Sequence, residues 1–165
     1  MENHIFKFNI ELDKNLLLNV LKFVKKNAVT YKDNRQDSYI DNWKIVRHNF
    51  PYATDLIFRL GLEKYDVRPR FYILHKNTTL KMHRDLGTQC SVNFILSDDP
   101  APVNIEGTNY YYENALLNTQ LEHGITDYSF NDRLLFKLSI MDLSFIDAKN
   151  IISANLPNLD HHRNL

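Results

Sequence analysis

Three potential metal ligands lie at two places in the sequence. His83 and Asp85 are separated by one residue, and His123 belongs to a later segment. Two imidazoles and one carboxylate are the ligand set of an open non-haem Fe(II) site, in which three protein ligands leave three coordination positions free. Zinc accepts the same ligand types, so spacing alone does not separate the two metals. The sequence therefore predicts a metal site formed by His83, Asp85 and His123.

Strand geometry allows these residues to meet. On a β-strand, residues i and i+2 point to the same face, so His83 and Asp85 can reach one ion while Arg84 points away. His123 comes from another predicted strand and can complete the site across a barrel. The chain has seven histidines, so one His-x-Asp could arise by chance. The ordered set, with the residues that follow it, favours the metal site.

A cation follows the last predicted ligand. Arg133 lies ten residues after His123 and begins the apolar segment 133–140, in which alternation puts Arg133 and Lys137 on one face. A guanidinium on the inward face of a barrel is costly to bury without an anion, and its shape suits a carboxylate. Lys137 could do the same. The alternative is a salt bridge at the strand edge, for example with Asp132 or Asp127.

The first third of the chain predicts supporting elements. Residues 5–10 alternate apolar and polar side chains, which predicts a strand, and Asp13 can cap a helix whose apolar positions continue to Val24. Residues 30–42 are polar and predict a loop. Trp43–Arg47 predicts a strand, and Pro51 suits the start of a second helix that ends at Gly61.

Beyond residue 67, short β-rich segments alternate with turn residues. We expect strands at Arg70–His75, Leu80–Asp85, Cys90–Leu96, Val103–Glu106, Asn109–Tyr112, Gln120–Ile125 and Arg133–Met141. Many short strands predict an antiparallel sandwich or barrel. We expect a mostly β single domain over 1–165, with helical support in 1–66, a β core in 67–143 and a peripheral tail in 144–165.

The composition excludes some partners. Lys+Arg and Asp+Glu are both 20, so the zero net charge gives no general attraction to nucleic acid or an anionic membrane. Cys90 is the only cysteine, which excludes an internal disulfide and suits a reducing compartment. No apolar run approaches the roughly 20 residues that span a bilayer. These features predict a cytoplasmic protein without a membrane partner, and they leave the oligomeric state open.

Four segments around the predicted ligands resemble the Fe(II)/2-oxoglutarate-dependent dioxygenases. They are residues 70–85, 91–96, 122–127 and 133–139, and the likeness extends over about 43–142. Within this superfamily the chain is most similar to the aspartyl/asparaginyl β-hydroxylase-type branch. Prolyl hydroxylases share the same plan, usually with Lys in place of the Arg.

The resemblance implies a fold and a set of roles. The fold would be a double-stranded β-helix (a jelly roll, cupin-like), with Fe(II) on the three predicted ligands. Arg133 would pair with the distal carboxylate of 2-oxoglutarate. Tyr72 corresponds to a hydroxyl side chain that approaches the same carboxylate, and Asn93 to a polar side chain near the cosubstrate's other end. The simpler interpretation is that Tyr72 lines the barrel and Asn93 is a buried, hydrogen-bonded amide.

The implied activity is hydroxylation of a C–H bond with O2, releasing succinate and CO2. Branch likeness suggests an amino-acid unit as substrate, either a free small molecule or part of a peptide or protein. The alternatives are a prolyl-hydroxylase-like oxygenase, a cupin-type metalloenzyme that does not use 2-oxoglutarate, and a non-catalytic binding protein.

Two further features bear on the substrate. Arginines at 47, 68, 70 and 84 could attract an acidic substrate. The simpler interpretation is that they are ordinary surface residues that keep the protein hydrated. The tyrosines at 110–112 could stack against a ring, but strand positions in a core or sheet face are the favoured interpretation because tyrosine is a strong β-former.

Overall fold

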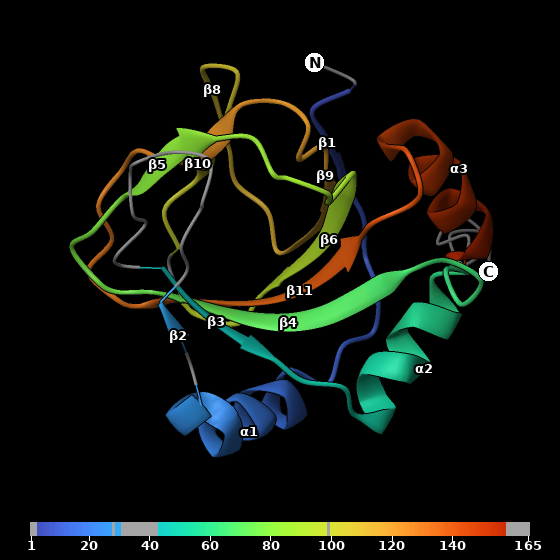
Figure 1. Ribbon diagram of the computed structural model, residues 1–165, viewed down its shortest axis with the longest axis horizontal. Coiled ribbons are helices and arrows are strands. Elements are labelled where there is room, and N and C mark those ends of the chain that lie inside the picture. Colours follow the sequence, from blue (N-terminus) through green and yellow to red (C-terminus); the bar gives the residue numbers. More distant parts are fainter. Residues whose placement is uncertain (1–2, 28, 31–42, 99, 158–165) are drawn as a thin grey trace, which may run out of the picture.

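The computed structural model describes residues 3–27, 29–30, 43–98 and 100–157 (Figure 1). Helices are α1 (Lys14–Val24), the short 3-10 helix η1 (Lys25–Asn27), α2 (Pro51–Arg59) and α3 (Phe145–Asn155). Strands are β1 (Ile5–Lys7), β2 (Val29–Thr30), β3 (Trp43–Arg47), β4 (Val67–Leu74), β5 (Leu80–His83), β6 (Cys90–Ile95), β7 (Val103–Ile105), β8 (Thr108–Tyr110), β9 (Asn114–Leu117), β10 (His123–Ile125) and β11 (Arg133–Ile140). None of the helices in these ranges is long and apolar enough to cross a bilayer.

The strands form two antiparallel sheets. The large sheet has seven strands in the order β1-β9-β6-β11-β4-β3-β2, and the small sheet has four in the order β5-β10-β7-β8. In Figure 1 the large sheet lies between the small sheet on one side and α1 and α2 on the other. The chain therefore has a mostly β jelly-roll fold, the double-stranded β-helix that the sequence predicts, with helices as support.

The helices cover the outer face of the large sheet. The Asp13 carboxylate accepts a hydrogen bond of 3.0 Å from the Leu16 N–H, which satisfies a free donor at the start of α1. Proline at the start of α2 costs no intrahelical hydrogen bond. Both helices bury their apolar faces against the sheet, where Phe71, Phe94 and Phe136 are fully buried in the same cluster.

Alternation along β4, β6 and β11 separates this core from the interior of the roll. Phe136 is aligned with Phe71 and Phe94 on the helix-facing side. One residue further on, Lys137 is aligned with Arg70 on β4 and Asn93 on β6, and these side chains face the small sheet. The same three strands therefore carry the apolar core on one face and polar groups on the other.

Most predicted elements are present, with three differences. Asn114–Leu117, which no prediction covered, forms β9 in the large sheet between β1 and β6. The segment from 144, expected to be peripheral, forms α3 over Phe145–Asn155, and Phe145, Ala148 and Ile152 are buried in the main core cluster. The strands predicted at 5–10 and at Trp43–Arg47 are present as β1 and β3, and β2 (Val29–Thr30), which no prediction covered, joins them in the large sheet. Residues 31–42 of the predicted loop and 158–165 of the predicted tail lie outside the described residues.

Candidate metal centre

The three predicted ligands come together in the interior of the roll. The Asp85 Oδ1 atom lies 3.3 Å from His83 Nε2 and 3.4 Å from His123 Nε2. The three donor atoms all lie within 4.8 Å of one another. Ligand atoms that each lie about 2.0–2.2 Å from a shared ion have separations of this size. The donor set is therefore close enough together to hold one transition-metal ion.

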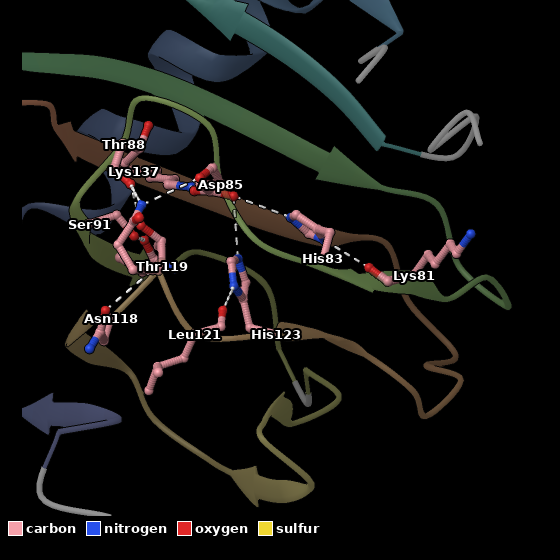
Figure 2. A network of polar contacts seen from close by, with 12 residues as sticks. Lys81, His83, Asp85, Thr88, Ser91, Asn118, Thr119, Leu121, His123 and Lys137 are labelled. Carbon is pink, nitrogen blue, oxygen red and sulfur yellow. Dashed lines mark hydrogen bonds and ion pairs between the residues drawn. The ribbon is translucent and has the colours of Figure 1, made fainter. Parts of the chain in front are cut away.

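Backbone carbonyls hold both imidazoles in the orientation that a metal requires. His83 Nδ1 lies 2.7 Å from the Lys81 carbonyl oxygen, and His123 Nδ1 lies 2.9 Å from the Leu121 carbonyl oxygen. A carbonyl can only accept, so each Nδ1 donates and each Nε2 keeps its lone pair for a metal. Figure 2 shows both rings directed at the Asp85 carboxylate with these carbonyls behind them.

Two adjacent strands of the small sheet position the histidines. β5 and β10 pair antiparallel, with His83 opposite His123, and the register shifts between His123 and Ile125. At that shift, a Cβ on Gly124 would lie 2.6 Å from the Leu80 carbonyl oxygen, so only glycine allows the two backbones to approach this closely. Asp85 follows the end of β5, where its N–H donates to the Thr119 carbonyl oxygen at 3.0 Å.

A buried lysine pairs with the carboxylate ligand. Lys137 Nζ lies 3.0 Å from Asp85 Oδ2, the oxygen that is not shared with the histidines (Figure 2). Burial alone would raise the pKa of the Asp85 carboxyl, but the Lys137 ammonium and the imidazoles of His123 and His83 outweigh it and hold the pKa well below its usual range. Burial alone would lower the pKa of Lys137, but Asp85 outweighs it and raises that pKa. The carboxylate is therefore ionised and fixed in orientation.

Arg133 is buried at the start of β11, with a relative exposure of only 3%. Its guanidinium donates to the Ala101 carbonyl oxygen and, at 3.3 Å, to the Tyr112 hydroxyl. In the part of the chain that the structure describes, Arg133 makes no salt bridge with an acidic residue. Asp132, a candidate partner, accepts instead from the Lys76 N–H at 2.8 Å. The alternative edge salt bridge with Asp132 is therefore not formed, and both hydrogen bonds named above go from the buried cation to neutral acceptors.

The two other predicted cosubstrate residues also line the interior. Tyr72 and Asn93 belong to the same cavity wall as the metal ligands, Arg133 and Lys137. Lys137 Nζ lies 5.2 Å from the centre of the Tyr72 ring, a cation–π distance. The Asn93 amide nitrogen donates to the Tyr112 hydroxyl at 3.2 Å. The structure therefore brings all six predicted site residues to one cavity.

Two members of the site make contacts that differ from what the sequence predicted for them. Tyr112, one of three consecutive tyrosines, joins Arg133 to Asn93 through its hydroxyl. Lys137, which the sequence offered as a second candidate for the cosubstrate cation, instead donates to the metal ligand Asp85. The alternation of side chains along β11 predicts that Lys137 lines the interior. The partner of Lys137 could not be predicted, because it depends on how β11 packs against β5. Tyr111 is exposed, and the Tyr110 hydroxyl lies 2.8 Å from His4 Nδ1.

No protein-family model matches the sequence, and no curated protein matches it. Solved structures share the fold. A prolyl hydroxylase from Trichoplax adhaerens, in complex with a peptide fragment of the hypoxia inducible factor oxygen degradation domain, has a TM-score of 0.62 at 13% identity, covering 84% of this chain and 82% of that chain. A prolyl-4-hydroxylase from Pseudomonas putida has a TM-score of 0.60 at 10% identity, covering 87% and 95%.

A third similar structure is an oxidoreductase of the 2OG-Fe(II) oxygenase family from Burkholderia pseudomallei. It has a TM-score of 0.54 at 13% identity, covering 83% of this chain and 84% of that chain. At such identities the likeness shows the fold, which this chain shares with 2-oxoglutarate Fe(II) oxygenases. Two of these three structures are prolyl hydroxylases, and none is described as an aspartyl/asparaginyl β-hydroxylase, so the branch stays a prediction.

Proposed function

We propose that the chain is a single-domain Fe(II)- and 2-oxoglutarate-dependent dioxygenase that hydroxylates a C–H bond and releases succinate and CO2. The shared oxygenase fold and the convergent histidine, aspartate and histidine donors support this activity. The observation that carries the cosubstrate assignment is the burial of Arg133 without an acidic partner among the described residues.

Arg133 needs an anion, and none of the residues that the structure describes supplies one. A buried guanidinium is costly unless it is paired with a negative charge, and its present acceptors are a neutral carbonyl and a neutral hydroxyl. A carboxylate matches the planar fork of an arginine. The distal carboxylate of 2-oxoglutarate is a suitable partner, since Arg133 and the metal ligands line the same cavity.

The remaining residues orient the reacting groups. His83, Asp85 and His123 would hold Fe(II), which together with 2-oxoglutarate and O2 supplies the oxidising chemistry when bound. Lys137 holds Asp85 Oδ2, so that Oδ1 faces the histidines. Tyr112 orients the Arg133 guanidinium. Tyr72 and Asn93 are proposed to line the cosubstrate subsite.

The substrate that we favour contains an amino-acid unit. The sequence likeness to the aspartyl/asparaginyl β-hydroxylase-type branch supports this class. The Trichoplax adhaerens prolyl hydroxylase binds a peptide, which supports a prolyl-hydroxylase-like alternative with a peptide substrate. A cytoplasmic location is proposed on the single cysteine, Cys90, which suits a reducing compartment.

The cosubstrate assignment is tested by Arg133→Ala, with Arg133→Lys as the variant that keeps the charge. Removing one partner of a buried charge pair costs about 2–5 kcal/mol, so Arg133→Ala should raise the 2-oxoglutarate KM or Kd at least about 30-fold. Arg133→Lys should recover part of this loss, and Fe(II) binding should be unchanged in both. Succinate release would be followed over free amino acids and peptides. An Arg133→Ala variant with unchanged activity would favour a cupin-type metalloenzyme that does not use 2-oxoglutarate.

A further inference from the structure

A second cationic region lies in the same cavity, away from Arg133. Lys137 and Arg133 share one face of β11 four residues apart, which separates their backbones by about 13 Å. Arg70 on β4 is directly opposite Lys137 and also lines the cavity. The cavity therefore has Arg133 near one end of β11, and Lys137 with Arg70 further along the same strands.

Unsatisfied polar atoms are concentrated beside this second region. Among the described residues, two buried side-chain polar atoms have no hydrogen-bond partner: Arg70 Nε and Ser139 Oγ. Ser139 lies two residues beyond Lys137 on the same face of β11. Buried donors are normally paired, so two unpaired groups in neighbouring positions indicate a place where a ligand supplies the missing acceptor. The Asp66 carboxylate interacts electrostatically with Arg70, but Asp66 is exposed and already forms a salt bridge of 2.9 Å with Arg68.

The net charge of the cavity also favours an anionic ligand. Among the residues that the structure describes, three cations line it, namely Arg70, Arg133 and Lys137, against the single carboxylate of Asp85. A divalent metal ion and the dianion 2-oxoglutarate would cancel each other. The loaded cavity would therefore keep its excess of positive charge, which favours an anionic second ligand.

We propose that the substrate carries an oxyanion, a carboxylate or a phosphate, which binds Arg70 at the Lys137 end of the cavity. This inference rests on the proposed function and adds a substrate class to it. Arg70 is a specificity-determining residue in this account, because it holds the charged end of the substrate while the C–H bond lies near the metal. The hydroxyls of Thr88, Ser91 and Thr119 also line this cavity, but each already donates to another protein group, so Arg70 is the donor that the anion would bind.

The test uses the whole protein with Mn(II) in place of Fe(II) and saturating 2-oxoglutarate, so that no turnover occurs. N-acetylglycine and its neutral amide, N-acetylglycinamide, are titrated separately, and the paramagnetic relaxation of their protons by Mn(II) is measured by NMR. Ethyl phosphate is a third probe that distinguishes a phosphate from a carboxylate. We expect at least one anionic probe to bind about tenfold or more tightly than the amide, as one charge-assisted hydrogen bond allows.

Arg70→Met should reduce the affinity of that anionic probe to the level of the amide, and Arg70→Lys should restore part of it. Arg68→Met is the matched control, because Arg68 lies on the same strand but is exposed and paired with Asp66, and it should leave the affinity unchanged. Thermal unfolding of each variant checks that the fold is retained, and Arg70→Gln replaces Arg70→Met if that variant fails to fold.

Three outcomes would overturn the anion site. These are equal binding of the amide and both anions, an unchanged anion affinity in Arg70→Met and Arg70→Gln, and an equal loss in Arg68→Met. Failure of the proposed function has a separate signature, which is that the wild-type Mn(II) protein does not bind 2-oxoglutarate. The Arg70 variants still decide the anion site in that case, because the probe reports its binding directly.

Discussion

The two faces of the large sheet differ sharply although the same strands form both. On the helix-facing side, Phe71, Phe94 and Phe136 pack together, with ring centres of Phe71 and Phe136 4.9 Å apart. One residue along β11, the cavity-facing side carries Lys137 between Arg70 and Asn93. The first face removes apolar surface from water and stabilises the fold. The second face buries charged side chains, which lowers stability. The proposed binding of a metal ion and a cosubstrate explains why these charges are there.

This separation means that substitutions on the two faces should have different signatures. Changes on the cavity side should affect metal, cosubstrate or substrate with modest changes in stability. Changes on the helix side should affect stability first.

Loss of a metal ligand should have the largest effect on activity. His83→Ala and His123→Ala should abolish stoichiometric Fe(II) binding, with a loss of succinate release beyond the roughly 10–100-fold typical of residues that only support ligands. Equilibrium dialysis and a succinate assay measure both. His75→Ala is the control, since His75 is half-buried but lies outside the donor cluster. Normal Fe(II) uptake by His83→Ala would contradict the assigned ligand set.

A core substitution on the opposite face should act on stability. Phe136→Ala should lower the free energy of unfolding by about 3–5 kcal/mol, because Phe136 is fully buried among other aromatic rings. Asn93→Ala, one strand away on the cavity side, removes two hydrogen bonds, one to Tyr112 and one from Ser91, and should cost about 1–3 kcal/mol at the net contribution of a typical hydrogen bond. Urea unfolding of the metal-free protein compares the two, and similar losses would remove the contrast between faces.

Lys137→Met should weaken metal binding without removing a ligand. It takes away the partner that fixes Asp85 Oδ2, so Fe(II) affinity should fall about 10–100-fold at neutral pH. Burial then raises the pKa of Asp85 with less to oppose it, so the pH midpoint of metal binding should move upward. Lys137→Arg keeps the charge and should move the midpoint less. An unchanged midpoint in Lys137→Met would contradict the pairing.

The same pair gives the metal-free protein a defined pH dependence. The depressed pKa of Asp85 contributes stability at pH values above its unfolded pKa, and this contribution is lost as the pH falls through the folded pKa. The raised pKa of Lys137 contributes stability below its unfolded pKa, and this is lost as the pH rises through the folded pKa. The unfolding temperature of Lys137→Met should therefore depend less on pH than that of the wild type, at both low and high pH. Thermal denaturation across pH measures this.

Gly124→Ala removes no ligand or hydrogen-bonding side chain, and it acts through the backbone. The added Cβ meets the Leu80 carbonyl oxygen at 2.6 Å and the Lys81 carbonyl oxygen at 3.0 Å, so β5 and β10 must separate. Overpacking of this kind costs about 1–3 kcal/mol. Fe(II) affinity should fall as well, because these strands carry His83 and His123. Thr126→Ala, at an exposed neighbouring position, should change neither quantity.

Much of the site could be predicted because its signals are local. The one-residue gap between His83 and Asp85 and the alternation along β11 are visible in the sequence. The contacts of Lys137 with Asp85 and of Tyr112 with Arg133 could not be predicted, because each joins segments that only the packing of the two sheets brings together.

The two missed elements have different explanations. β9 is four residues long, and Asn114 interrupts its apolar pattern at the first position. α3 did carry a local signal that sequence reasoning missed. Ser144 accepts from the Asp147 N–H at 3.1 Å, the Ser-x-x-Asp pattern of a helix start, and Phe145, Ala148 and Ile152 follow at helical spacing.

The central claim is that one Fe(II) ion and one 2-oxoglutarate bind together in this cavity. It is tested most directly by adding 2-oxoglutarate to the Fe(II)-loaded protein without oxygen and recording the visible spectrum. We expect a weak charge-transfer band that saturates at one equivalent of 2-oxoglutarate in the wild type. The same band should require far more 2-oxoglutarate in Arg133→Ala. A protein that binds Fe(II) stoichiometrically but develops no band at saturating 2-oxoglutarate would contradict it.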